Sequence, residues 1–174
     1  PAGQRVNLKA RLAEDLLTRL AGSPMPVIAR NSTFTYKGKA VDVKQVGREL
    51  GVRYVVEGSV RRSENRVRVS VQLIDATSGA HLWAEQYDDE LRGVFALQDE
   101  ITERIAGAMR VTVFRSEQQR AARQQPEKLD AWDSQMRGWW CFFHLTRDEN
   151  TRARSFFEKA AELAPSSAEP YWGL

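Results

Sequence analysis

The stretch that decides the fold is Arg66-Val-Arg-Val-Ser-Val-Gln-Leu73. Apolar residues occupy alternate positions in it and polar residues occupy the others, which is the pattern of a strand with one buried face. The turn-forming segment Ser63-Glu-Asn65 precedes it, and Asp75-Ala-Thr-Ser-Gly79 follows it. Because short connections join antiparallel neighbours, we predict three strands, over residues 54–60, 66–73 and 81–87.

Helical patterns and one further strand surround these three strands. Leucine recurs every four residues from Leu8 to Leu20, which predicts an amphipathic helix. The apolar run Val27–Arg30 predicts a short strand. A second helix is expected between Asp42, whose carboxylate can cap its first turn, and Gly51, a natural helix stop. A long helix begins near Val94.

The order of these elements is α-β-α-β-β-β-α, which predicts an α/β domain with helices packed on a mixed sheet. The polar stretch Arg120–Lys128 ends the long helix and separates this domain from an all-α segment. We therefore expect one domain over residues 1–119 and a helical domain over residues 127–174.

Two glycines are expected to have structural roles. Gly58 interrupts a strand of branched residues, which indicates a bulge or close packing by a helix or an aromatic neighbour. Gly79 is expected to take a positive φ in the turn before the third strand.

Composition limits the class of protein. The chain has 174 residues, of which 42% are hydrophobic, and a mean hydropathy of −0.51. Its apolar runs are too short for a transmembrane helix. The single cysteine, Cys141, can form neither an internal disulfide nor a cysteine-based zinc site, so a cytoplasmic location is expected.

Charge is unevenly distributed along the chain. Residues 30–68 hold ten Lys and Arg against four Asp and Glu, a local net charge of +6. Such a segment can bind nucleic acid or an acidic partner. Arginines on the outward face of a half-buried strand explain it better, since their stems cover apolar surface while the charged heads stay in water. The absence of interleaved aromatic residues and of a known nucleic-acid motif favours this second interpretation.

The residues that could carry chemistry all have a plainer explanation. His81 stands next to a strand tryptophan and has no nucleophilic neighbour at motif spacing. Cys141 and His144 are three residues apart, but Cys141 stands among aromatic residues, as a small packed hydrophobe does. Residues 88–90 are acidic without the alternate spacing of a calcium loop and are expected to cap a turn. We therefore predict no catalytic, cofactor-binding or metal-binding residue and no cofactor.

Six blocks of sequence occur in a characteristic order, at residues 27–39, 46–54, 57–62, 72–76, 79–84 and 95–101. Together they closely resemble the TolB amino-terminal-like module of bacterial class III adenylate cyclases, CadC-type regulators and related signalling proteins. The resemblance covers roughly residues 8–115. In this family the module precedes tetratricopeptide repeats and has a further strand before its first helix, so we expect the chain to be part of a longer protein.

The residues after Pro126 are similar to a tetratricopeptide repeat, which is a pair of antiparallel helices with small residues where they cross. The first helix is expected over residues 129–145, with Met136 and Gly138 near the close approach. The second is expected over residues 152–163, with small and large residues alternating at the crossing. These are Ala153, Phe157 and Ala160. Residues 147–150 are expected to lengthen the loop, and the chain to stop within a second repeat.

These inferences predict a non-catalytic segment that acts in regulation or in protein interaction. The resemblance implies that this segment is the accessory region of an adenylate cyclase. The expected partner is another protein, another part of the parent chain or a second copy, and the parent itself can be membrane-attached. The candidate interaction surface comprises Arg61, Arg62, Arg66, Arg68, Trp139, Trp140 and Trp172. Two alternatives remain open: a small-ligand or nucleic-acid sensor that uses the basic sheet face, and a hydrolase built around Cys141.

Overall fold

The described part of the chain begins with the predicted amphipathic helix. The computed structural model describes residues 8–22, 26–36, 39, 41–90 and 94–167. Helix α1 (Leu8–Ala21) buries Leu12 and Leu20, as the leucine spacing predicts. Two short helices follow, α2 (Arg30–Phe34) and α3 (Val43–Leu50).

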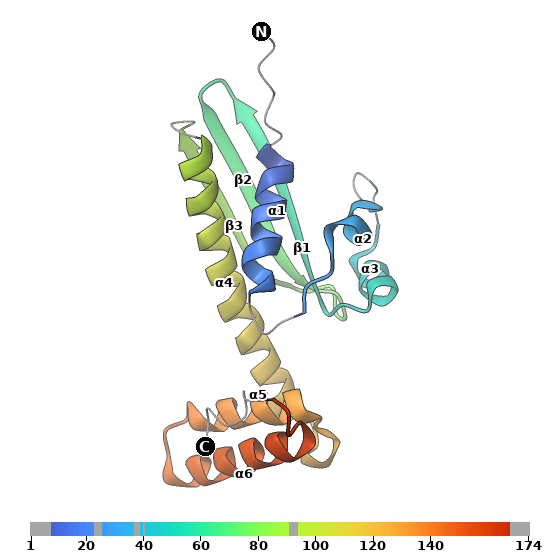
Figure 1. Ribbon diagram of the computed structural model, residues 1–174, viewed down its shortest axis with the longest axis vertical. Coiled ribbons are helices and arrows are strands. Elements are labelled where there is room, and N and C mark those ends of the chain that lie inside the picture. The colour runs from blue at the N-terminus through green and yellow to red at the C-terminus, as the bar shows by residue number, and fades with distance from the viewer. Residues whose placement is uncertain (1–7, 23–25, 37–38, 40, 91–93, 168–174) are drawn as a thin grey trace. The chain divides into compact units, whose positions relative to one another are not determined.

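Three antiparallel strands form a sheet in the order β1-β2-β3 (Figure 1). They are β1 (Tyr54–Ser63), β2 (Arg66–Asp75) and β3 (His81–Glu90), each two or three residues longer than predicted. Ser63 pairs with Arg66 across a two-residue turn. In the next turn, Asp75 Oδ1 accepts a hydrogen bond from the backbone N–H of Thr77 at 2.7 Å. Gly79 has a φ of 80°, which confirms the predicted positive value.

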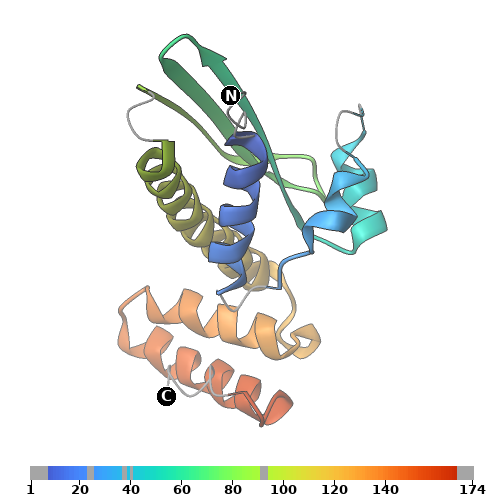
Figure 2. The same cartoon turned by 45° about the horizontal axis from the view of Figure 1, so that its top comes forward.

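Helices α1 and α4 (Val94–Arg123) cover one face of the sheet (Figures 1 and 2). Arg19 of α1 forms ion pairs with Asp99 and Glu103 of α4, and the Arg104 guanidinium lies 4.8 Å from the centre of the Tyr87 ring of β3. The core contains the alternating apolar residues of β2 together with residues of β3 and α4. These are Val67, Val69, Val71, Leu73, Tyr87, Ile101, Ile105 and Met109.

Helix α3 begins and ends where the sequence predicts. The Asp42 carboxylate accepts a hydrogen bond from the backbone N–H of Lys44 at 3.0 Å, and Gly51 closes the helix with a φ of 65°. The helix packs closely against the end of β2, because a Cβ at Gly47 would lie 2.6 Å from the Cβ of Ala76. The caps thus set the length of α3, and Gly47 sets its distance from the sheet.

The strand predicted at Val27–Arg30 is wrong. Ala29 is extended, with φ and ψ of −59° and 146°, but helix α2 begins at Arg30 and Val27 is 37% exposed. A short apolar run forms a strand only when a neighbouring strand accepts its hydrogen bonds. In the described residues the sheet is therefore antiparallel throughout rather than mixed. The predicted class, helices packed on a sheet and followed by a helical segment, is confirmed.

Gly58 does not lie in a bulge. It pairs regularly with Val71, and the irregularity of the sheet lies between Leu73 and Ile74 instead. A Cβ at Gly58 would lie 3.2 Å from the carbonyl oxygen of Ser70, so the close neighbour is a strand and not a helix or an aromatic ring.

The chain forms two compact units, Pro1–Arg110 and Val111–Leu174, and helix α4 runs through both. After a 3₁₀ turn (Pro126–Lys128), the second unit continues with α5 (Ala131–Phe142) and α6 (Arg147–Leu163). Buried Ala153, Phe157 and Ala160 confirm the predicted packing face of α6. The predicted domains, residues 1–119 and 127–174, are defined by sequence and not by these compact units. Their limits remain a prediction.

The close approach of α5 and α6 occurs at Gly138, as predicted. A Cβ there would lie 2.6 Å from Cε1 of Phe157, which is fully buried. The expected loop insertion at residues 147–150 is wrong, because these residues form the first turn of α6. Thr146 caps that turn by accepting a hydrogen bond from the backbone N–H of Glu149 at 3.2 Å.

Candidate interaction surfaces

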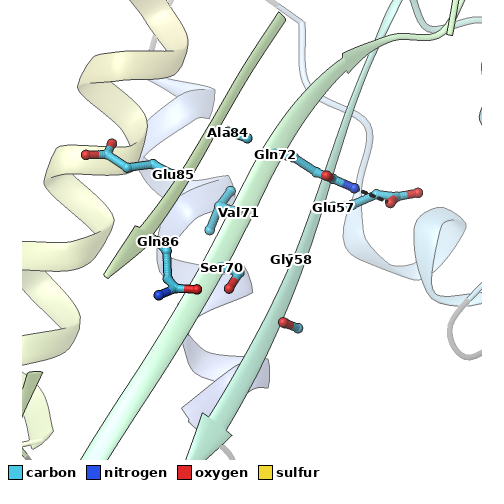
Figure 3. A pocket seen from close by; sticks show the side chains of 9 residues that line it. Glu57, Gly58, Ser70, Val71, Gln72, Ala84, Glu85 and Gln86 are labelled. Carbon is cyan, nitrogen blue, oxygen red and sulfur yellow. Dashed lines mark hydrogen bonds between the residues drawn. The ribbon is translucent and has the colours of Figure 1, made fainter. Parts of the chain in front are cut away.

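The first candidate surface is the open face of the sheet, which is the face turned away from α1 and α4. Cross-strand pairing arranges its side chains in three rows, Glu57–Gln72–Ala84, Ser59–Ser70–Gln86 and Arg61–Arg68–Asp88. The first two rows line a shallow groove of about 510 Å³ (Figure 3). Its floor is low because Ser59, Ser70 and Ala84 are small. One interaction crosses it, from Gln72 Nε2 to Glu57 Oε2 at 2.9 Å.

Both arginines of β2 lie opposite acidic residues of β3, and one of the two forms an ion pair. Arg68 Nε donates to Asp88 Oδ1 at 2.7 Å, and this pairing lowers the pKa of Asp88 below its ordinary value. Arg66 lies opposite Glu90 in the β2–β3 register. The expectation that residues 88–90 cap a turn is wrong, since all three belong to β3. Two of the three lie opposite arginines of β2, whereas Asp89 lies opposite Val67.

The two arginines of β1 are in a different position. Arg61 lies opposite Arg68, and Arg62 lies opposite Val67. Among the residues that the structure describes, neither the Arg61 nor the Arg62 side chain forms a hydrogen bond or an ion pair. The two arginines of β1 thus differ from Arg68 of β2, which is paired with Asp88.

The second candidate surface is the aromatic end of α5. The Trp139 ring packs edge-on against Phe157, with 5.1 Å between ring centres, and stacks on Phe143 at 5.9 Å. Trp140 packs against His144, whose Nδ1 lies 2.7 Å from the Trp140 carbonyl oxygen. Both tryptophans are half-buried.

The residues that face solvent at this end are phenylalanines and a leucine. Phe142 is 40% exposed, Phe143 is 58% exposed and Leu145 is 77% exposed. The sequence analysis names Trp139 and Trp140 for the surface, and it does not name Phe142 or Phe143. The remaining predicted surface residue, Trp172, lies outside the described residues.

A buried polar cluster that the sequence analysis did not predict joins α4 to α5. The Arg120 guanidinium forms ion pairs with Asp133 and with Glu117, the latter at 2.7 Å. The side chains of Glu117 and Asp133 are 3% and 8% exposed. Trp132 Nε1 also donates to Glu117, at 3.0 Å. No local signal marks this cluster, because its members lie up to 16 positions apart on two helices.

Cys141 has the properties of a packed hydrophobe. It is 1% exposed within the cluster around Ala153 and Phe157. The pKa of the Cys141 thiol is raised to about 11, mainly by burial and to a smaller extent by the hydrogen bond of the thiol to Glu149. The nucleophilic thiolate is therefore a minor species at neutral pH. In the described ranges, no three His, Cys, Asp or Glu side chains are placed to hold a metal ion.

The chain was compared with known proteins. It matches no protein-family model. It is 42% identical, over 164 residues, to a protein of Rhizobium meliloti (strain 1021) described as "Putative adenylate cyclase 3". The alignment covers 94% of this chain, which includes residues of both units, and 28% of the length of that protein. The chain is thus similar to one region of a longer protein. No helix in the described residues is long and apolar enough to cross a membrane.

Proposed function

We propose that this chain is a non-catalytic regulatory segment of an adenylate cyclase-type signalling protein, and that it acts in the cytoplasm by binding protein. In this proposal residues 1–119 are a TolB amino-terminal-like module and residues 127–174 are the start of a tetratricopeptide array. The similarity to one region of a longer adenylate cyclase-related protein supports the assignment to a cyclase.

The observation that carries the binding role is the apolar end of α5. The interior of the α5–α6 pair is closely packed, with Phe157 and Ala160 fully buried. Phe142, Phe143 and Leu145 nevertheless remain in water. An aromatic residue buries roughly 150–250 Å² when it is covered, so two exposed phenylalanines and a leucine form a patch of the size that marks interaction sites.

We propose another part of the parent chain as the partner of this patch. Such a contact lets the segment influence the output of the parent without a catalytic group of its own. The ion pair of Arg68 with Asp88 favours this function over a nucleic-acid sensor, because binding of phosphate by Arg68 would require that ion pair to be replaced.

The test uses the relative from Rhizobium meliloti with its matching region deleted. Fluorescently labelled chain is titrated with that protein, and we expect saturable binding. F142Q/F143Q should weaken it at least tenfold. L163Q is the matched control, because Leu163 is a 53% exposed residue of the same helix pair, and it should leave affinity unchanged. Equal affinity of both variants and the unmodified chain, or no binding at all, would contradict the proposal.

A further inference from the structure

A pocket of about 250 Å³ lies between α3 and the turn that joins β2 to β3 (Figures 1 and 2). Within the described part of the chain, two cationic side chains and one hydroxyl group line it, and no carboxylate does. The lining residues are Lys44, Gly47, Arg48, Val52, Ala76 and Thr77. All six belong to the first compact unit, so the pocket is a different site from the aromatic end of α5.

The floor of this pocket, formed by Gly47, Val52 and Ala76, is apolar and closely packed. Gly47 and Ala76 are buried, and a Cβ at Gly47 would lie 2.6 Å from the Cβ of Ala76. The backbone N–H of Val52 donates to the carbonyl oxygen of Gly47 at 3.0 Å, and that of Ala76 donates to the carbonyl oxygen of Arg53 at 2.7 Å. The backbone of the floor is therefore already ordered, and a ligand does not have to order it.

The two cations of the pocket do not serve helix α3 itself. Lys44 lies in the first turn of α3, where the helix dipole disfavours a positive charge. Its stem passes beside the β2–β3 turn, because a Cβ at Gly79 would lie 3.0 Å from Cε of Lys44. Arg48 follows one turn later on the same side of the helix, and like charges at this spacing repel each other. An anion bound between them would remove that repulsion.

The carboxylates that lie near these cations in the sequence are bound to other groups. The Asp42 carboxylate caps α3, and the Asp75 carboxylate accepts backbone hydrogen bonds within the β2–β3 turn. The Glu49 carboxylate accepts hydrogen bonds from the side chains of Tyr36 and Gln45. In the part of the chain that the structure describes, the two cations of the pocket form no ion pair, so their charge is available to a ligand.

We propose that this pocket binds a small phosphate monoester. The Lys44 ammonium supplies a point charge and the Arg48 guanidinium supplies a fork of N–H donors, and both suit a phosphate group. The hydroxyl of Thr77 is a further hydrogen-bond donor at the same pocket. The apolar floor suits the carbon skeleton of the ester, since ligand pockets combine apolar surface with a few polar groups that fix orientation.

Titration of the isotope-labelled chain with phenyl phosphate, followed by NMR at constant ionic strength, tests the site. The backbone signals of Lys44, Arg48 and Thr77 should shift and saturate, whereas phenol should move none of them. Inorganic phosphate should bind more weakly than phenyl phosphate, because it has no carbon skeleton to cover the floor. K44Q/R48Q should raise the Kd at least tenfold. R61Q/R62Q is the matched control, because it removes the same charge from exposed arginines of β1, and its Kd should stay within threefold.

T77E provides an independent variant. Thr77 is exposed in the turn, so the change should preserve the melting temperature while it adds a carboxylate to the pocket and abolishes the signal shifts. Vesicles of phosphatidylcholine and phosphatidic acid, whose headgroup is also a phosphate monoester, distinguish a lipid from a soluble ester, and the chain should not sediment with them. Binding to the vesicles but not to phenyl phosphate would overturn the proposal. Shifts that do not saturate, or equal losses in K44Q/R48Q and R61Q/R62Q, would also overturn it.

Discussion

At the scale of single residues, Gly138 determines how closely α5 approaches α6. The ring of Phe157 occupies the space that any side chain at this position would need, with three ring atoms within 2.9 Å of the missing Cβ. Phe157 cannot move easily, because it is fully buried and also packs against Trp139.

We predict that Gly138→Ala destabilises the second unit by about 1–3 kcal/mol, which is the usual cost of overpacking. Urea unfolding followed by tryptophan fluorescence measures the change. Gly107→Ala is the control, because Gly107 lies in α4 with no atom within 4 Å of a Cβ. That variant should gain about 0.5–1 kcal/mol from the lower flexibility of alanine. A neutral Gly138→Ala would show that the helices separate without cost.

Gly79 is constrained by its backbone. Its φ of 80° is strained for a residue with a side chain, and a Cβ would also lie 3.0 Å from Cε of Lys44. We predict that Gly79→Val costs about 1–3 kcal/mol. Gly79→Asn should cost less, because asparagine tolerates the left-handed region. Thermal unfolding followed by circular dichroism compares the two, and equal melting temperatures would contradict the role given to this turn.

Cys141 should react slowly with thiol reagents in the folded chain. Its pKa is raised to about 11, so at pH 8 the thiol is protonated, and it is also shielded from solvent. We expect reaction with a chromogenic disulfide at pH 8 to be complete only after urea is added. Rapid modification without urea would show that the aromatic cluster opens readily.

At the scale of elements, the buried ion-pair cluster attaches α5 to the end of α4. Arg120 lies between two nearly buried carboxylates, and replacing it would remove the ion pair that each of them forms with it. Removing one partner of a buried ion pair costs more stability than the intact pair contributes. The reason is that the remaining charge stays buried with neither its partner nor water around it.

We predict that Arg120→Met destabilises the second unit by about 3 kcal/mol, as one-sided loss of a buried ion pair does. Urea unfolding at pH 7 provides the measurement. Arg154→Ala is the matched control, because Arg154 pairs with Glu158 on the exposed side of α6. That variant should change stability by less than about 0.5 kcal/mol. If the two variants behaved alike, the cluster would contribute no more than a surface ion pair.

At the scale of the whole molecule, the chain should make no cyclic AMP. The chain matches 28% of the length of its adenylate cyclase-like relative, and in the described residues no group of three or more His, Cys, Asp or Glu could hold a metal ion. Purified chain incubated with ATP and Mg²⁺ or Mn²⁺ should form no more cyclic AMP than a heat-killed control. Turnover above that control would contradict the non-catalytic role.

Much of the architecture was predictable from sequence, because the deciding signals are local. The alternation in Arg66–Leu73 specifies a strand with one buried face, and the caps at Asp42 and Gly51 specify both ends of α3. Gly138, Ala153 and Phe157 specify where the two helices of the second unit cross. In each case a residue's own conformational preference, or the burial of one face of its own element, carries the information.

Tertiary structure alone decided the features that depend on distant partners. Val27–Arg30 has the composition of a strand but no strand to pair with in the described residues. The arginines of β2 and β1 look alike in sequence, yet only those of β2 lie beside β3 carboxylates. Packing on Phe157 covers Trp139 and leaves Phe143 in water. Burial and charge pairing depend on neighbours that lie far away in the chain. Local sequence therefore determines which residues can be paired or covered. The fold determines which of these residues are actually paired or covered.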